Sequence, residues 1–324
     1  MHINRILIII FVIMFIILII IPPPSMKFSS VVGNRRGAGL FSVINANYIS
    51  SIIYCRENGI DNIYIKYKDI KNQYSTKDTD INQYLVSDCI KNNGINYNIF
   101  QQIHNLLWSG SYANYMYGFG NRTKFPATSS KSLLTIHNYI KDSFDFKPKY
   151  HNIADNFLSD YTGYYIFGVH YRGGDTIHHY PYVKQNPKWF VQRLQQLTQE
   201  LNRPYKVLVC SIDKECYSIF ETVFKDELIY FNNDIDINGS QSDFGNWQNT
   251  NESGTERAEN AILDCLLLSK CDYLIKNRSN ISETSLILNP HIPCTIIFSD
   301  KEVFLKKENE YRFTGPYNLK NYNL

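Results

Sequence analysis

Short apolar runs alternate with amphipathic segments of helical length through the second half of the chain. Asn186 and Pro187 form a good helix start, as an N-cap followed by a proline in the first turn. Strands that alternate with helices predict a parallel sheet covered on both faces, which is a Rossmann-like nucleotide-binding unit. The apolar runs typical of strands lie at residues 164–167, 206–210, 228–231, 273–275 and 294–298, and the helical segments at 187–201, 215–224, 256–270 and 281–288.

The first half shows the same pattern less regularly. Residues 27–32 and 63–65 predict two strands, and near-helical apolar spacing over residues 41–54 predicts a helix between them. The turn Gly37-Ala38-Gly39 precedes that helix, so we expect a second Rossmann-like unit whose glycines let the helix approach a ligand. Close packing of the helix on the strand explains these glycines equally well.

The middle of the chain marks the division between the two halves. Residues 66–131 are polar and irregular, with an aromatic piece that either walls an acceptor site or packs in the ordinary way. Residues 132–161 predict one or two helices joined near Pro148. We therefore expect one domain over residues 26–150 and a second over residues 151–324.

An apolar segment precedes both domains. Residues 6–21 are sixteen apolar residues without a charge, followed by three prolines. At 1.5 Å per residue this helix would span about 24 Å, which suits a thin bilayer. It is either a signal peptide or a signal anchor, and the lack of a small-residue cleavage site favours an uncleaved anchor over residues 1–25. The positive-inside rule does not decide the orientation.

Composition excludes one class of partner and bears on the compartment. A net charge of +3 without a basic block argues against nucleic acid. The seven cysteines are compatible with one or two luminal disulfides, and because their number is odd at least one thiol is left over. Cys265 and Cys271 lie six apart on a predicted helix, so we expect neither a bridge between them nor a metal site. Five glycosylation sequons occur, at Asn121, Asn238, Asn251, Asn277 and Asn280.

The central candidate site is the stretch of residues 168–176, GVHYRGGDT. It follows an apolar strand, so His170 and Arg172 leave the same face at the carboxyl end of the sheet, where open α/β sheets bind ligands. Arg172 can bind a phosphate through two parallel hydrogen bonds, and the turn at Gly173 and Gly174 can offer backbone N–H groups to the same anion. The alternative is a hairpin-type turn with a surface arginine.

Two further segments carry candidate ligands. Asp264 lies in a nearly all-apolar predicted helix, where a buried carboxylate needs hydrogen-bond partners. It either accepts hydrogen bonds from the N1–H and exocyclic amine of a guanine or belongs to a polar stripe along the helix. Ser279, Asn280 and Ser282 follow a strand and open a helix, which favours anion binding. Capping chemistry explains Ser282 equally well. If this loop grips a diphosphate, the sequons at Asn277 and Asn280 should be empty.

These residues together resemble a known family. The pattern His170-x-Arg172-x-x-Asp175, followed by Asp264-x4-Ser269-x2-Asp272 and then Ser279, is similar to the GDP-fucose-dependent fucosyltransferases of the α1,2, α1,6, nodulation-type and protein O-fucosyltransferase group. The resemblance covers residues 164–298 and extends more loosely to the glycine turn at residues 37–39. It implies an α/β fold of the GT-B type, with the sugar nucleotide held by residues 151–324 and the acceptor by residues 26–150.

The resemblance also implies roles for single residues. Arg172 would contact the β-phosphate and stabilise the departing GDP, so that inversion at the fucose carbon needs no metal ion or other cofactor. His170 and Asp264 would contact the guanosine, Ser279 and its neighbours the phosphates. Asp175 would order the Arg172 loop. The implied partners are GDP-fucose, a glycan or glycoprotein acceptor and, through the anchor, a membrane; the implied location is the Golgi or endoplasmic reticulum, as a type II protein.

The chain departs from the family pattern in two places. Several members have a second basic residue after the arginine, where this chain has Gly173, and this leaves the linkage open. Charged residues that follow in the α1,6 enzymes are absent, and His178 and His179 stand there instead. Either imidazole could accept the proton of the acceptor hydroxyl, and either could equally be a surface residue.

Three other functions remain to be separated from this one. A metal-dependent GT-A transferase would need an Asp-x-Asp motif; Asp78-x-Asp80 and Asp234-x-Asp236 have that spelling, but both lie in polar loop segments. A non-catalytic, membrane-anchored glycoprotein with the same fold would be expected to have lost Arg172 or Asp264, and this chain retains both. A GT-B transferase using another nucleotide sugar would be distinguished by its choice of base.

Overall fold

The protein is described from a computed structural model. It describes residues 27–33, 40–49, 52–53, 62–68, 84–86, 133–173, 186–211, 213–231, 254–277, 279–298 and 301–304. Within these ranges no helix has the length and apolar character needed to cross a membrane. The expected anchor, residues 6–21, lies outside them.

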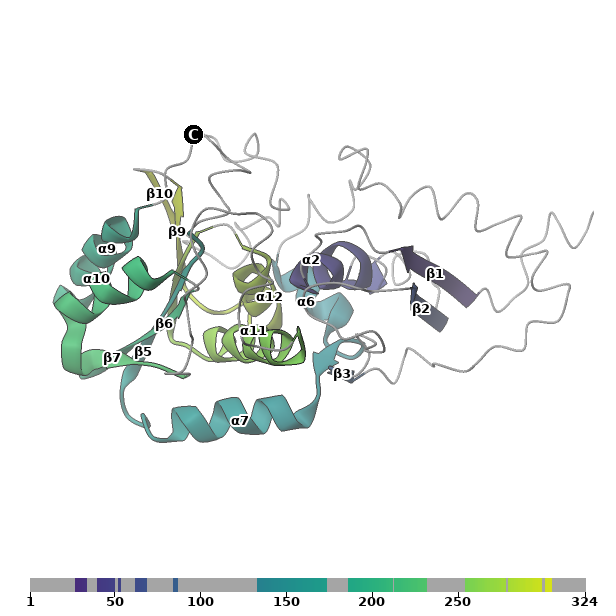
Figure 1. Ribbon diagram of the computed structural model, residues 1–324, viewed down its shortest axis with the longest axis horizontal. Helices are drawn as coiled ribbons and strands as arrows, with labels where there is room; N and C mark the ends of the chain where they lie inside the picture. Colours follow the sequence, from purple (N-terminus) through teal and green to yellow (C-terminus); the bar gives the residue numbers. More distant parts are fainter. Residues whose placement is uncertain are drawn as a thin grey trace, which may run out of the picture.

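A six-stranded sheet forms the centre of the described structure (Figure 1). Its order is β10-β9-β8-β5-β6-β7, so the chain starts in the middle with β5, moves out to one edge and then returns to build the other side. The first five strands in chain order run parallel, as predicted, whereas the edge strand β10 is antiparallel to β9 and was not predicted. The bounds are β5 Tyr165–Tyr171, β6 Tyr205–Ser211, β7 Leu228–Ile229, β8 Tyr273–Lys276, β9 Cys294–Phe298 and β10 Lys301–Phe304.

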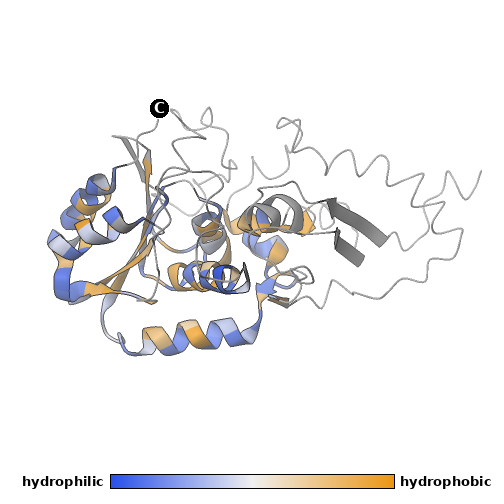
Figure 2. Ribbon diagram, viewed as in Figure 1, coloured by the Kyte–Doolittle hydropathy of each residue, from blue (hydrophilic) through white to orange (hydrophobic). Residues whose placement is uncertain are grey.

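Helices of the described structure cover both faces of this sheet (Figure 1). Helices α9 (Pro187–Gln199) and α10 (Lys214–Phe224) pack on one face, and α11 (Gly254–Ser269) and α12 (Asn280–Leu288) on the other. The strands are largely apolar while the helices are mixed, as expected for a buried layer between two half-exposed ones (Figure 2). The described helices and parallel strands of this half match the predicted order.

Alternation along β5 divides its side chains between two hydrophobic cores. Phe167, Val169 and Tyr171 contribute to the core under α9 and α10. Ile166 contributes to the core under α11 and α12, and by the same alternation His170 and Arg172 face that side. The face that carries the polar candidates is therefore the face covered by α11 and α12.

Gly168 allows α11 to lie close against β5. A Cβ atom at this position would come within 2.8 Å of the Cys271 Sγ and within 3.1 Å of the Leu268 Cδ2. Both distances are too short for ordinary side-chain contact, so the glycine is required by packing. The sequence places His170 and Arg172 at the carboxyl end of this strand, and β5 continues through Gly168 to Tyr171, directly before Arg172.

The N-terminal part of the described structure contains the expected strand–helix–strand order. Strands β1 (Lys27–Gly33) and β2 (Asn62–Lys68) are parallel, and α2 (Leu40–Val43), continued by the π-helix η1 (Ile44–Ile49), lies between them in sequence. The short antiparallel pair of β3 (Leu85–Val86) and β4 (Asp145–Phe146) was not predicted.

The expected domain boundary at residue 150 falls inside a helix. Helices α6 (Leu133–Ile140) and α7 (Pro148–Ser159) lie within residues 132–161, where the sequence predicts one or two helices. One hydrophobic cluster contains residues from both sides of the boundary, such as Phe41 and Leu266. The division into two domains stays a prediction.

Five of the seven cysteines fall within the described residues, and all five are free and buried. They are Cys210, Cys216, Cys265, Cys271 and Cys294. Two disulfides would need four cysteines, and only Cys55 and Cys89 remain, so the expectation of a second disulfide is wrong. As predicted, Cys265 and Cys271 are not bridged to each other.

Candidate active site

The strand order places a topological switch point between β5 and β8, because the chain builds outward from β5 first to one side and then to the other. Open α/β sheets bind ligands at the carboxyl ends of the strands at such a point. Arg172 and Gly173 follow β5 directly, and Asn277 follows β8. The predicted phosphate-binding arginine therefore lies at the position in the sheet that most favours a ligand.

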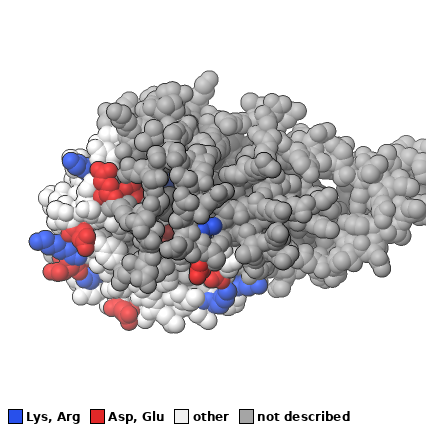
Figure 3. Space-filling model, in the orientation of Figure 1, with Lys and Arg blue, Asp and Glu red and all other residues white. Residues whose placement is uncertain are grey.

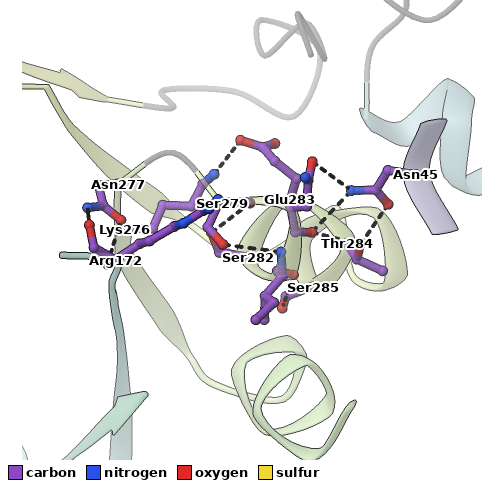
Figure 4. Close-up of polar contacts among 11 residues, drawn as sticks. Asn45, Arg172, Lys276, Asn277, Ser279, Ser282, Glu283, Thr284 and Ser285 are labelled. Carbon is purple, nitrogen blue, oxygen red and sulfur yellow. Dashed lines mark hydrogen bonds and ion pairs between the residues drawn. The ribbon is translucent and has the colours of Figure 1, made fainter. Parts of the chain in front are cut away.

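Asn277 connects the two strand ends. Its backbone N–H donates to the His170 carbonyl at 3.3 Å. Its side-chain Nδ2 donates to the Arg172 carbonyl at 2.8 Å, and its Oδ1 accepts from the Arg172 N–H at 3.0 Å (Figure 4). The residue is fully buried.

The Arg172 side chain extends from the end of β5 towards Ser279 at the start of α12 (Figure 4). The Ser279 hydroxyl caps this helix by accepting from the Ile281 N–H at 3.4 Å. A helix N-terminus carries partial positive charge and free N–H groups, so the arginine and the helix offer charge of the same sign to one region. An anion is the ligand that such an arrangement favours.

The other two predicted residues of α12 make intramolecular contacts. The buried Ser282 hydroxyl donates to the Ser279 carbonyl at 3.2 Å, a bond within the first turn, whereas the cap itself is Ser279. The Asn280 Oδ1 accepts from the Asn45 Nδ2 at 3.4 Å, and the same Nδ2 donates to the Asn280 carbonyl at 3.1 Å. Asn45 thus joins η1 to the first turn of α12, and Thr284 donates to its Oδ1 at 2.7 Å. Any contact of Ser282 or Asn280 with a ligand remains a prediction.

A row of polar residues crosses the sheet at the level of His170, two positions before Arg172. His170 on β5 is paired in register with Cys210 on β6 and with Lys276 on β8. Register partners on adjacent strands share a face, so all three point to the side of α11 and α12. The Lys276 ammonium is fully buried and forms an ion pair with Glu283 on α12 (Figure 4).

His170 is held as a neutral ring. Burial and the neighbouring cations of Lys276 and Arg172 lower the pKa of His170 to about 3. Its side chain is buried, and Nδ1 has no hydrogen-bond partner among the described residues. A neutral imidazole that remains uncharged at physiological pH can donate or accept a hydrogen bond from a ligand but does not act as a charged acid.

Asp264 on α11 lies close to this row. Burial raises the pKa of Asp264 to about 7, and a hydrogen bond with the Cys210 thiol opposes part of that rise. The Cys210 thiol is a hydrogen-bond partner of the Asp264 carboxylate, and the residue as a whole is half-buried. A carboxylate can accept several hydrogen bonds, and contact of Asp264 with a guanine stays a prediction.

Gly173 lies against the N-terminus of α10. A Cβ atom here would come within 2.2 Å of the Asp213 Oδ2, and Asp213 caps α10 by accepting from the Glu215 N–H at 2.9 Å. A second basic side chain at this position, as in several fucosyltransferases, would thus need a different local structure. The absence of a side chain at Gly173 has a packing reason.

Several predicted residues lie outside the described residues. Among the candidate site residues these are Gly174, Asp175, His178 and His179, and both Asp-x-Asp motifs at residues 78–80 and 234–236 lie outside them as well. Their roles stay predictions.

Sequence reasoning missed three residues of the site. Lys276 is a charged residue at the end of an apolar strand, and Asn45 is a polar residue within an apolar helical segment, so each carried a weak signal. Asn277 was considered only as a sequon. Its partnership with Arg172 depends on which strands are neighbours, which no local pattern shows.

On the face shown in Figure 3, the basic and acidic side chains of the described residues lie in small mixed groups.

Solved structures of fucosyltransferases resemble this fold. Fucosyltransferase NodZ from Bradyrhizobium matches with a TM-score of 0.52 and 11% identity, over 87% of this chain and 99% of that chain. NodZ α-1,6-fucosyltransferase soaked with GDP-fucose matches with a TM-score of 0.50 and 12% identity, over 86% and 99%. A variant of Arabidopsis thaliana FUT1 in complex with GDP matches with a TM-score of 0.50 and 10% identity, over 87% and 72%.

At the level of sequence, no protein-family model and no curated protein matches the chain. The structural likeness, in contrast, spans most of the chain. The protein thus has the mixed α/β fold of the GDP-fucose-dependent fucosyltransferases, which confirms at the level of the fold the resemblance drawn from its sequence.

Proposed function

We propose that this protein is a GT-B glycosyltransferase that transfers fucose from GDP-fucose to a glycan or glycoprotein acceptor, with inversion and without a metal ion. The observation that carries the proposal is the position of Arg172. It lies at the switch point of the sheet, and its side chain extends towards the N-terminus of α12. The fold shared with the solved fucosyltransferases supports the choice of donor.

Arg172 and the first turn of α12 would hold the diphosphate. As the bond from fucose to the β-phosphate breaks, negative charge grows on the departing GDP. A guanidinium already aimed at that oxygen stabilises the charge without rearranging solvent, and the helix N-terminus adds to it. This is the role that a metal ion fills in other glycosyltransferases.

Asp264 and His170 would recognise the guanosine. An ionised carboxylate accepts two hydrogen bonds from the N1–H and exocyclic amine of guanine, and adenine or uracil offers no matching donor pair. The unpartnered Nδ1 of His170 provides a further neutral hydrogen-bonding group on the same face. Choice of base is therefore the property that best distinguishes this function from that of a transferase using another nucleotide sugar.

The acceptor would bind on the side of residues 26–150. Inversion requires the acceptor hydroxyl to attack from the face opposite the leaving GDP, and we propose His178 or His179 as the base that takes its proton. We also propose that residues 1–25 anchor the protein in the Golgi or endoplasmic reticulum membrane as a type II protein.

The test is release of GDP from GDP-fucose by the purified chain, with GDP-mannose and a UDP-sugar as competing donors and a chelator present throughout. The proposal predicts turnover with GDP-fucose that the chelator leaves unchanged. Arg172→Ala should lower the rate at least about a hundredfold, because the loss of such a group costs about 2.7–4 kcal/mol of barrier.

A matched control is Arg193→Ala. Arg193 lies on α9 at the opposite face, where its guanidinium bonds Thr295 and Gln196, and its loss should leave turnover intact. Turnover that needs added metal would contradict the mechanism. Selective GDP binding without turnover across an acceptor screen would instead favour the non-catalytic binding protein.

A further inference from the structure

We propose that Asn277 is a positioning residue for Arg172. Its side chain fixes the backbone from which the arginine reaches the donor phosphates. The inference rests on the proposed function, because Asn277 would affect that reaction through the position of Arg172.

The side chain of Asn277 continues the hydrogen bonding between β5 and β8 beyond the last paired residues of the two strands. The register of β5 and β8 ends with His170 opposite Lys276, and the Asn277 N–H still donates to the His170 carbonyl. Beyond that point the side chain takes over, donating to the Arg172 carbonyl at 2.8 Å and accepting from its N–H at 3.0 Å. Both peptide groups that flank the Arg172 Cα atom are thereby held by one side chain.

Both halves of the carboxamide are needed for this contact. Aspartate at residue 277 would keep the acceptor for the Arg172 N–H but would turn a carboxylate oxygen towards the Arg172 carbonyl. Leucine would keep the approximate shape and lose both bonds. Because Asn277 is fully buried, water cannot replace the lost partners without a rearrangement of the strand ends.

Fixing the Arg172 backbone matters because the arginine acts at the end of a long side chain. A change in the direction of its Cα–Cβ bond moves the guanidinium by a larger distance, and a displacement of about 1 Å can cost about a hundredfold in rate. Arg172 lies past the end of β5, where the ladder of the sheet no longer holds it. The two hydrogen bonds from Asn277 constrain the Arg172 backbone at this point.

The experiment is a double-mutant cycle on turnover of GDP-fucose, using Asn277→Leu and Arg172→Ala alone and together. Asn277→Asp repeats the cycle in case the leucine variant folds poorly. If Asn277 acts through Arg172, each Asn277 variant should lower kcat by about ten- to a hundredfold in the unaltered protein and by less than about twofold when residue 172 is already alanine.

Asn289→Leu is the matched control. Asn289 also donates from Nδ2 to a carbonyl, that of Ser269 at 2.9 Å, and accepts at Oδ1 from a backbone N–H, that of His291 at 3.3 Å, but it lies at the other end of α12. The control variant should lower the unfolding temperature without lowering kcat. A merely structural role for Asn277 would give the same result as the control.

Hydrogen exchange of the Arg172 amide provides a reading independent of activity. Loss of the Asn277 acceptor should speed exchange of this amide at least about tenfold, whereas Asn289→Leu should leave it unchanged. Equal losses of kcat in both backgrounds, or unchanged kcat despite faster exchange, would overturn the inference. If the unaltered protein shows no turnover, the proposed function is overturned and the role of Asn277 in it falls as well. Slow hydrogen exchange of the Arg172 amide in that protein would then show that the Asn277 contact is present and that the assigned function is what is wrong.

Discussion

Lowering the pH from 8 to 6 should weaken binding of GDP about tenfold through Asp264 alone. Guanine needs the ionised carboxylate, and burial raises the pKa of Asp264 to about 7 in the ligand-free protein. The ionised fraction is then about 0.9 at pH 8 and about 0.1 at pH 6. Because the apparent dissociation constant varies inversely with the binding-competent fraction, affinity should fall by the ratio of these fractions.

The direction of the effect follows from the direction of the shift. A raised pKa means that the free protein binds a proton at Asp264 at pH values where an ordinary aspartate would not, and that proton competes with guanine. Binding of GDP should accordingly release a proton near pH 6. An aspartate with an ordinary pKa would show no change over this range.

Isothermal titration calorimetry across this pH range gives both affinity and proton release. The terminal phosphate of GDP also titrates near pH 6, so Asp264→Asn serves as the control. We expect this variant to bind GDP more weakly at pH 8, and the pH dependence that remains in the variant to come from the phosphate. The same pH dependence in both proteins would refute the assignment of Asp264 to the base.

Three further predictions concern packing, charge and modification. Gly168→Ala should lower the free energy of unfolding in urea by about 1–3 kcal/mol, because the new Cβ atom would lie 2.8 Å from the Cys271 Sγ. Adding Cys271→Ala should restore most of this loss, and additive losses in the double variant would contradict a direct contact between the two residues. Lys276→Met should destabilise the fold by about 3–5 kcal/mol, because it removes the cation that pairs with the buried Glu283 carboxylate. Lys276→Met combined with Glu283→Leu should restore much of that loss, and equal losses in the single and double variants would argue against the ion pair. In a glycosylating host, mass spectrometry of the active protein should find no glycan on Asn277, since both side-chain polar atoms are bonded in the fold, and an occupied site would contradict the structure.

The regular part of the fold could be predicted because its patterns are local. The N-cap at Asn186 accepts from the Lys188 N–H as expected, and β9 has the predicted bounds. Gly168 shows what a local pattern does not supply. The strand that contains it could be predicted, but the need for a glycine there comes from a helix in a distant part of the sequence that packs against it.

The site could be predicted only as separate pieces. Arg172, Asp264 and Ser279 each had a chemical reason to bind a sugar nucleotide, and the structure places them on one face of the sheet or at the adjoining helix N-terminus. The contacts that join the pieces are between residues far apart in sequence: Asn277 and Arg172 are 105 positions apart, and Asn45 and Thr284 are 239 apart. Such pairs follow from strand order and helix packing, which hydrophobic periodicity does not encode.

Calorimetric binding of GDP, compared with UDP and ADP in the presence of a chelator, tests the central claim most directly. The account predicts that GDP binds in preference to the other two without metal, and that Arg172→Ala weakens this binding while Arg193→Ala does not. Equal binding of the three nucleotides, or binding that appears only when a divalent cation is added, would contradict a guanine-selective, metal-independent donor site at the carboxyl edge of this sheet.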